Sequence, residues 1–108
     1  MTEPCDLSAT EARRLIGCKR LSPIELVDSC IARIEMVNPT VNAVVAECYD
    51  RARVEARAAT EALVTGDSLG ALYGLPFGVK DLNDTEGVVT TYGSPLYRDH
   101  VPTKDELL

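Results

Sequence analysis

The sequence predicts an α/β fold, in which helices at the N-terminus lead into the first strands of a sheet. Three segments have the apolar spacing and end residues of helices: 8–16, 23–38 and 47–64. Three others are short, rich in β-branched residues and bounded by turn residues, as strands are: 41–46, 77–82 and 88–92. Helices and strands that alternate in this way are typical of α/β architectures. A chain of 108 residues can form at most one small domain.

The first two helices are predicted from their ends. Ser8-Ala-Thr-Glu11 and Ser22-Pro-Ile-Glu25 are capping boxes, in which the serine and the glutamate each bond a backbone N–H at the start of a helix. Gly17 suits the left-handed residue that often follows a helix, and Asn38-Pro39 should stop the second helix. The second helix carries one apolar stripe: Ile24, Val27, Ile31 and Ile34. This stripe should face a core.

The third helix, over 47–64, is predicted to be long, alanine-rich and charged on its outer side. Residues of one face are mostly small: Cys48, Ala52, Ala56, Ala59 and Leu63. Small residues allow a helix to approach its neighbour closely, so this face should pack against a sheet. The arginine and glutamate residues elsewhere on the helix indicate a solvated surface.

Composition and charge exclude several classes of protein. Seventeen acidic and 11 basic residues give a net charge of −6, whereas nucleic-acid-binding modules normally carry a basic surface, so we expect no direct nucleic-acid partner. Four cysteines without Cys-x-x-Cys spacing and one histidine do not fit a zinc site, and no cofactor is expected. The sequence shows neither a signal-peptide pattern nor a membrane-length apolar run. We therefore expect a cytoplasmic protein with reduced thiols and no membrane partner.

The segment Gly74-Leu-Pro-Phe-Gly-Val-Lys-Asp-Leu82 places one cation, Lys80, in an apolar run that contains glycines. Two interpretations remain open from the residues alone. Lys80 lies on the exposed face of a strand, or it is a buried amine whose charged form burial disfavours, so that it can accept a proton. A single lysine in a strand is a weak signal, and spacing alone favours the exposed interpretation.

Two longer motifs surround Lys80. The first is Gly70-Ala-Leu-Tyr-Gly-Leu-Pro-Phe-Gly-Val-Lys-Asp81, and the second is Thr85-Glu-Gly-Val-Val-Thr-Thr-Tyr-Gly-Ser94. Both resemble the N-terminal motif region of the amidase signature family. Residues 21–26, Arg33-Ile-Glu35 and Asn38–Ala43 resemble the segment that precedes this region in the family. The resemblance covers nearly the whole chain and implies the mixed-sheet α/β fold of that family.

The resemblance also implies roles for individual residues. Lys80 matches the lysine of a Ser–cis-Ser–Lys triad, which hydrolyses amides through an acyl-enzyme, and is therefore the candidate catalytic residue. Asp81 should support the strand or loop, and His100 should be a surface residue. Four residues are expected to line or border the site: Thr91, Tyr92, Gly93 and Ser94. Ser94 does not match the nucleophile of the family.

Both catalytic serines of the family lie in a Gly-Gly-Ser-Ser-Gly-Gly-like loop, which these 108 residues do not contain. A third capping box, Thr103-Lys-Asp-Glu106, predicts a helix that begins after Thr103, with Leu107 and Leu108 as its first apolar residues, and the sequence stops about one turn into it. One turn is too short to form a stable helix. We therefore expect an N-terminal fragment of an amidase that is inactive alone.

Three functions are compatible with these observations. The first is a carbon–nitrogen hydrolase that acts, at full length, on a small-molecule amide. The resemblance to the family is also compatible with a homodimer of the full-length protein. The second is a fragment of a glutamyl-tRNA amidotransferase A subunit, although residues 83–94 resemble general amidases slightly better. The third is a non-catalytic remnant or interaction fragment. We expect no amidase turnover from the 108-residue chain, and any activity that depends on Lys80 would contradict the fragment interpretation.

Overall fold

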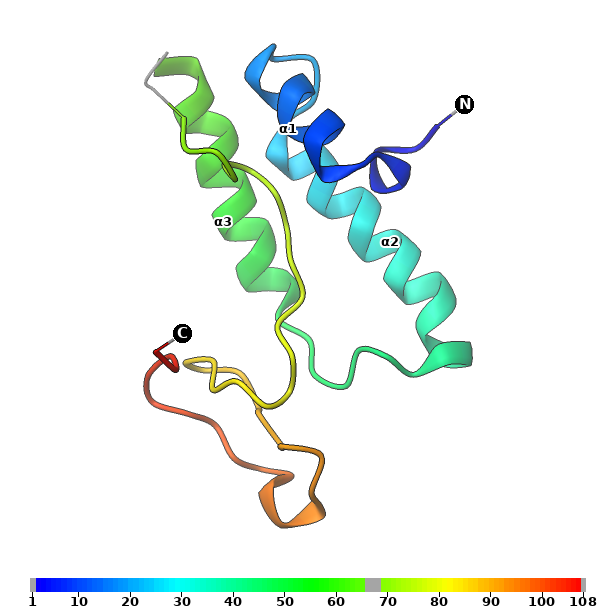
Figure 1. Ribbon diagram of the computed structural model, residues 1–108, viewed down its shortest axis with the longest axis vertical. Coiled ribbons are helices and arrows are strands. Elements are labelled where there is room, and N and C mark those ends of the chain that lie inside the picture. The colour runs from blue at the N-terminus through cyan, green and yellow to red at the C-terminus, as the bar shows by residue number, and fades with distance from the viewer. Residues whose placement is uncertain (1, 66–68, 108) are drawn as a thin grey trace. The chain divides into compact units, whose positions relative to one another are not determined.

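The computed structural model describes residues 2–65 and 69–107, and within them the α-helices are α1 (Ala9–Gly17), α2 (Pro23–Val41) and α3 (Tyr49–Ala62) (Figure 1). Short 3-10 helices are formed by Pro4–Asp6, Leu63–Thr65 and Pro95–Tyr97. The described residues form two compact units. The helical unit comprises residues 2–41, 49–65 and 69–76, and the loop unit comprises residues 42–48 and 77–107.

Helix α1 begins as predicted but ends differently. The Ser8 hydroxyl accepts a hydrogen bond from the Glu11 N–H at 3.1 Å. Glu11 does not complete the capping box, because its carboxylate pairs with Arg14 at 2.6 Å. The prediction that Gly17 is the left-handed residue is wrong: Gly17 is still helical, and the positive φ of 60° occurs at Lys19.

Helix α2 begins with the reciprocal capping box that the sequence predicts. The Glu25 N–H donates to the Ser22 hydroxyl at 3.1 Å, and the Ser22 N–H donates to the Glu25 carboxylate at 3.2 Å. The prediction that Asn38-Pro39 stops this helix is wrong, since α2 continues to Val41 with Pro39 inside it. Pro39 lies in the last turn, so little helix follows its missing N–H. Asn42 then leaves the helix with a φ of 50°, a conformation that asparagine tolerates.

Helices α2 and α3 lie side by side in the helical unit, joined into a hairpin by the segment between them (Figure 1). Their contact is formed by a buried cluster of Val27, Ile31 and Ala56. Val27 and Ile31 belong to the predicted apolar stripe of α2. Ala56 is one of the small residues predicted on one face of α3. That face packs against α2 rather than against a sheet.

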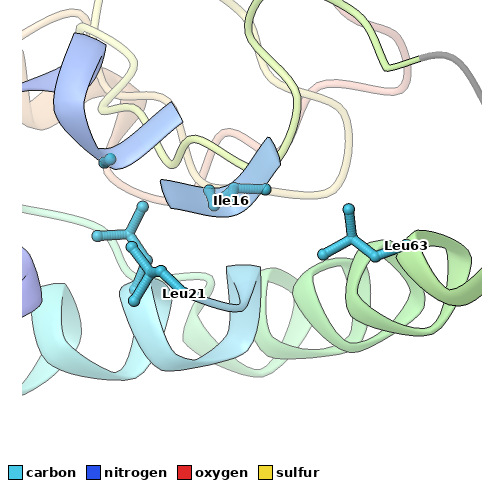
Figure 2. Packing of buried hydrophobic residues seen from close by; sticks show 5 residues of the cluster. Ile16, Leu21 and Leu63 are labelled. Atoms are coloured by element: carbon cyan, nitrogen blue, oxygen red, sulfur yellow. The ribbon is translucent and has the colours of Figure 1, made fainter. Parts of the chain in front are cut away.

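A second cluster joins α1 to the start of α2 and the end of α3. Ile16 is 0% exposed, and Leu21 and Leu63 are almost as deeply buried (Figure 2). Gly74 passes directly over this cluster with a φ of +79°, and a Cβ there would lie 3.1 Å from Ile16 Cδ1 and 3.0 Å from Pro23 Cγ. Glycine is therefore required at position 74 both by conformation and by space. The Tyr73 hydroxyl also donates to the Ala59 carbonyl at 2.6 Å, which fastens this segment to α3.

The predicted strands at 41–46, 77–82 and 88–92 are wrong for the part of the chain that the structure describes, which contains no strand. The one piece of β-pairing there is an antiparallel bridge between Thr85 and Val88. A strand needs a neighbouring strand to pair its backbone groups and a covered face to bury its side chains. Phe77 is instead 85% exposed, so the described residues supply no such face for it.

None of the helices in residues 2–65 and 69–107 has the length and apolar character needed to cross a membrane.

Candidate functional site

The candidate catalytic residue, Lys80, lies in the loop unit just before a turn. Its side chain is exposed, and its carbonyl accepts a hydrogen bond from the Asn83 N–H at 2.9 Å. Lys80 is therefore the first residue of a reverse turn over 80–83 rather than part of a strand. The buried surroundings that a lysine base requires are not provided by the described residues.

The next residue, Asp81, is held by the second motif. One oxygen of its carboxylate accepts from the Thr91 N–H at 2.8 Å, and the other accepts from the Thr91 hydroxyl. The Asp81 carbonyl also accepts from the Tyr92 N–H at 2.9 Å. The hydrogen bonds from the Thr91 side chain and backbone stabilise the carboxylate and lower the pKa of Asp81. Asp81 thus ties residue 81 to residues 91 and 92.

A second cluster lies beside this link and consists of Asp84, Tyr92 and His100. The Tyr92 hydroxyl donates to Asp84 Oδ1 and lies 3.2 Å from His100 Nε2. His100 Nε2 lies 3.7 Å from the same carboxylate oxygen. The Tyr97 ring packs edge-on against Tyr92, with the ring centres 5.0 Å apart. The hydrogen bond to Asp84 requires the phenol proton and therefore favours the neutral form, which raises the pKa of Tyr92 to about 12.

The sequence does not predict this cluster. His100 is expected from the sequence to be a surface residue, yet it is only partly exposed and contacts Tyr92. Asp84 belongs to no predicted site. The three side chains come together across the 17 residues from Asp84 to His100, and no local spacing rule links them.

The loop unit is held together from within by Thr90, which is 2% exposed. Its N–H donates to the His100 carbonyl at 2.9 Å, and its hydroxyl donates to the Val88 carbonyl at 3.2 Å. The helix predicted to begin at Thr103–Glu106 is absent from the described residues. The Glu106 N–H, which a capped helix would direct to Thr103, instead donates to the Asp84 carbonyl at 2.9 Å.

The four predicted site-lining residues follow one another in a tight turn. Tyr92 and Gly93 both have positive φ values, 55° and 73°. The Thr91 hydroxyl oxygen accepts from the Gly93 N–H at 3.2 Å, and Ser94 caps the 3-10 helix at Pro95–Tyr97 by accepting from the Leu96 N–H at 3.3 Å. Their polar groups thus stabilise the turn itself. Whether these residues line a substrate site stays a prediction, as does the role of Lys80.

The part of the chain that the structure describes holds no group of three or more histidine, cysteine, aspartate and glutamate residues suited to a metal ion.

The raised pKa of Tyr92 leads to a measurable prediction. A titration followed by tyrosinate absorbance should contain a component with a midpoint near pH 12. Tyr92→Phe should remove this component, and Asp84→Asn should lower its midpoint because the carboxylate acceptor is lost. Since the folded-state value lies above the ordinary tyrosine pKa of about 10, the contact stabilises the loop unit fully below that pH, and this stability is lost as the pH rises through about 12. Tyr49→Phe, in α3, is the control; an unchanged component in Tyr92→Phe would contradict the prediction.

Comparison with known proteins places these motifs in a family. A model of the amidase family matches residues 25–108. The A subunit of the glutamyl-tRNA(Gln) amidotransferase from Granulibacter bethesdensis is 40% identical over 102 residues, which cover 94% of this chain and 20% of that protein. An acylamidase of Rhodococcus erythropolis is 38% identical over 99 residues, which cover 90% of this chain and 20% of that protein.

Solved structures agree with this assignment. A bacterial aryl acylamidase of the amidase signature family superposes with a TM-score of 0.82 at 36% identity, covering 88% of this chain and 20% of that one. A protein from a vestigial complex that reveals the evolutionary origins of an s-triazine catabolic enzyme superposes with a TM-score of 0.87 at 32% identity, covering 92% of this chain and 22% of that one.

The fold and motifs are those of an amidase-type α/β protein, of which the described residues form a largely helical part. The chain belongs to the amidase signature family. It spans about a fifth of the length of the curated relatives that it matches.

Proposed function

We propose that this chain supplies the catalytic lysine of an amide hydrolase of the amidase signature family. The observation that carries the proposal is the motif around Lys80, which lies inside the segment matched by the family. The substrate class is a small-molecule carboxamide, and the products are a carboxylic acid and an amine or ammonia. We further propose that residues 1–108 form one partial domain of a cytoplasmic enzyme that contacts neither nucleic acid nor membrane directly and that is compatible with a homodimer.

The proposed role of Lys80 is that of a general base. The neutral Nζ takes a proton from a bridging serine as that serine takes the proton of the nucleophilic serine. The nucleophile forms a bond to the amide carbon, the carbon–nitrogen bond breaks, and the nitrogen leaves with a proton returned through the same relay. Water then attacks the acyl-enzyme and releases the acid. The two serines would come from a loop that is not among these 108 residues.

The exposure of Lys80 sets a condition on this mechanism. A lysine becomes an effective base only where burial disfavours its charged form. Because Lys80 is exposed among the described residues, other parts of the enzyme would have to cover it. The 108-residue chain alone should therefore show no amide hydrolysis.

A hybrid enzyme tests the proposal. The chain replaces the fifth of the Rhodococcus acylamidase that it matches, and release of amine from acyl amides is measured. We expect the hybrid to retain turnover, whereas the 108-residue chain and the acylamidase deprived of that fifth should both be inactive. A soluble, folded hybrid without turnover would contradict the proposal.

A second candidate is the A subunit of a glutamyl-tRNA amidotransferase, because the identity to the Granulibacter protein, 40%, is as high as that to the acylamidase. The same replacement made in the Granulibacter protein discriminates between the two. Turnover of glutamine in this second hybrid, together with an inactive acylamidase hybrid, would favour the second candidate.

A further inference from the structure

The residue that follows Lys80 is held much more firmly than Lys80 itself. Asp81 accepts three hydrogen bonds from Thr91 and Tyr92, two at its carboxylate and one at its carbonyl. Lys80 has one described backbone bond, from the Asn83 N–H to its carbonyl. The backbone at position 80 is therefore fixed from its C-terminal side.

A carboxylate next to a catalytic lysine could serve the lysine directly, as an ion-pair partner, or indirectly, through the backbone. The geometry favours the indirect role. Both oxygens of Asp81 are engaged by Thr91, and none of the ion pairs in residues 2–65 and 69–107 joins Asp81 to Lys80. A carboxylate paired with Lys80 would favour the charged amine, which is the opposite of what a base needs.

The link between Asp81 and Thr91 is reinforced three residues further along. Tyr92, the neighbour of Thr91, donates its hydroxyl to Asp84. Residues 81–84 are thus attached to residues 91–92 at both ends of the turn, and this turn is the one that Lys80 opens. Two attachments fix both the position and the direction of a short segment, whereas a single attachment leaves it free to rotate.

We propose that Asp81 is a positioning residue for Lys80: its carboxylate, held by the Thr91 N–H and hydroxyl, fixes the backbone from which the lysine side chain extends. The proposal rests on the proposed function of Lys80. Correct placement of a reacting group can account for large rate effects, and a displacement of about 1 Å can cost on the order of 100-fold. Asp81 takes no part in proton transfer.

The first test uses the 108-residue chain and needs no activity. Backbone ¹⁵N relaxation should show that Lys80 and Asp81 are as ordered as the rest of the loop unit. Asp81→Ala and Thr91→Val should both loosen these positions, because each removes part of the link. Asp81→Asn should preserve the order, since an amide can accept from the Thr91 N–H and donate to its hydroxyl oxygen. Asp99→Ala, an exposed aspartate of the same unit, is the matched control.

The second test uses the hybrid enzyme. Asp81→Ala should lower kcat by roughly 10- to 100-fold with little change in KM, because substrate binding is unaffected while the base is misplaced. The pH profile of kcat/KM should also shift, since a displaced amine has different surroundings. Asp81→Asn should recover most of the loss, and Asp99→Ala should match the unmodified hybrid.

The outcomes separate this inference from the proposed function. If Lys80 variants are inactive but Asp81→Ala equals the unmodified hybrid in kcat and pH profile, the positioning role is overturned and the proposed function stands. If Asp81→Asn is as impaired as Asp81→Ala, the charge rather than the link matters, and the inference is also overturned. If Lys80 variants remain active, the proposed function fails, and the positioning role fails with it.

Discussion

Replacing Lys80 with methionine is expected to reduce amide hydrolysis by the hybrid enzyme by at least about 1,000-fold. General-base catalysis contributes on the order of 100- to 10,000-fold to the rate. In a relay with two serines, the lysine is the group that finally accepts the proton of the nucleophile. Methionine has a similar length and cannot accept that proton. Because methionine is close to lysine in size and is apolar, it also fits the covered position that the mechanism requires, and the fold should be unchanged. Steady-state kinetics together with a circular-dichroism spectrum of the variant check both expectations.

Two further variants show what the lysine contributes. Lys80→Arg should be as inactive as Lys80→Met, because a guanidinium keeps its proton at any pH that the enzyme tolerates. This result separates a base from a mere positive charge. Lys104→Met, at an exposed lysine of the same unit, should leave turnover unchanged. Activity in Lys80→Arg within about tenfold of the unmodified hybrid would mean that charge suffices, and would overturn the proposed mechanism.

The helix starts could be predicted because capping is local. Ser8 and Ser22 each bond a backbone group three residues away, so the sequence alone contains all that the contact requires. The helix ends are predicted less well. Pro39 continues α2, and Lys19 rather than Gly17 takes the left-handed conformation. At a helix end, packing of the following segment competes with local preference, and the competitor lies outside the local window.

The strands could not be predicted correctly because a strand depends on distant partners. Residues 77–82 have the composition of a strand, yet Phe77, Val79 and Leu82 are exposed. In the described residues the backbone of the loop unit is satisfied by turns instead, such as the bond from the Asn83 N–H to the Lys80 carbonyl. β-propensity expresses how well a residue fits a half-buried sheet surface, and it does not create that surface.

The candidate site is predicted unevenly for a related reason. Lys80 is predicted to be catalytic because its motif resembles that of a family, and residues 91–94 are predicted to border the site in the same way. The expectation that Asp81 supports a loop also agrees with its bonds to Thr91. The cluster of Asp84, Tyr92 and His100 is missed, because only the folded loop brings these residues together. A motif identifies residues that are close together in the sequence, whereas contacts between residues of different motifs are seen only in the structure.

Ile16→Ala is expected to destabilise the helical unit by about 2–5 kcal/mol, the range for truncating a buried isoleucine. Ile16 is 0% exposed and lies under the backbone of Gly74, so the lost atoms leave a cavity that α1, α2 and the 69–76 segment cannot easily close. A unit of this size has a total stability of only a few kcal/mol, and the helical circular-dichroism signal should therefore be largely lost.

Urea unfolding of Ile16→Val gives the graded comparison, because this variant should lose only about 0.5–1.5 kcal/mol of stability. Met36→Ala in α2, at a residue that is 69% exposed, should change stability by less than about 0.5 kcal/mol. Equal unfolding curves for Ile16→Ala and Met36→Ala would contradict the assignment of Ile16 to the core. They would also contradict the conclusion that this core holds Gly74, near the start of the Lys80 motif, in place.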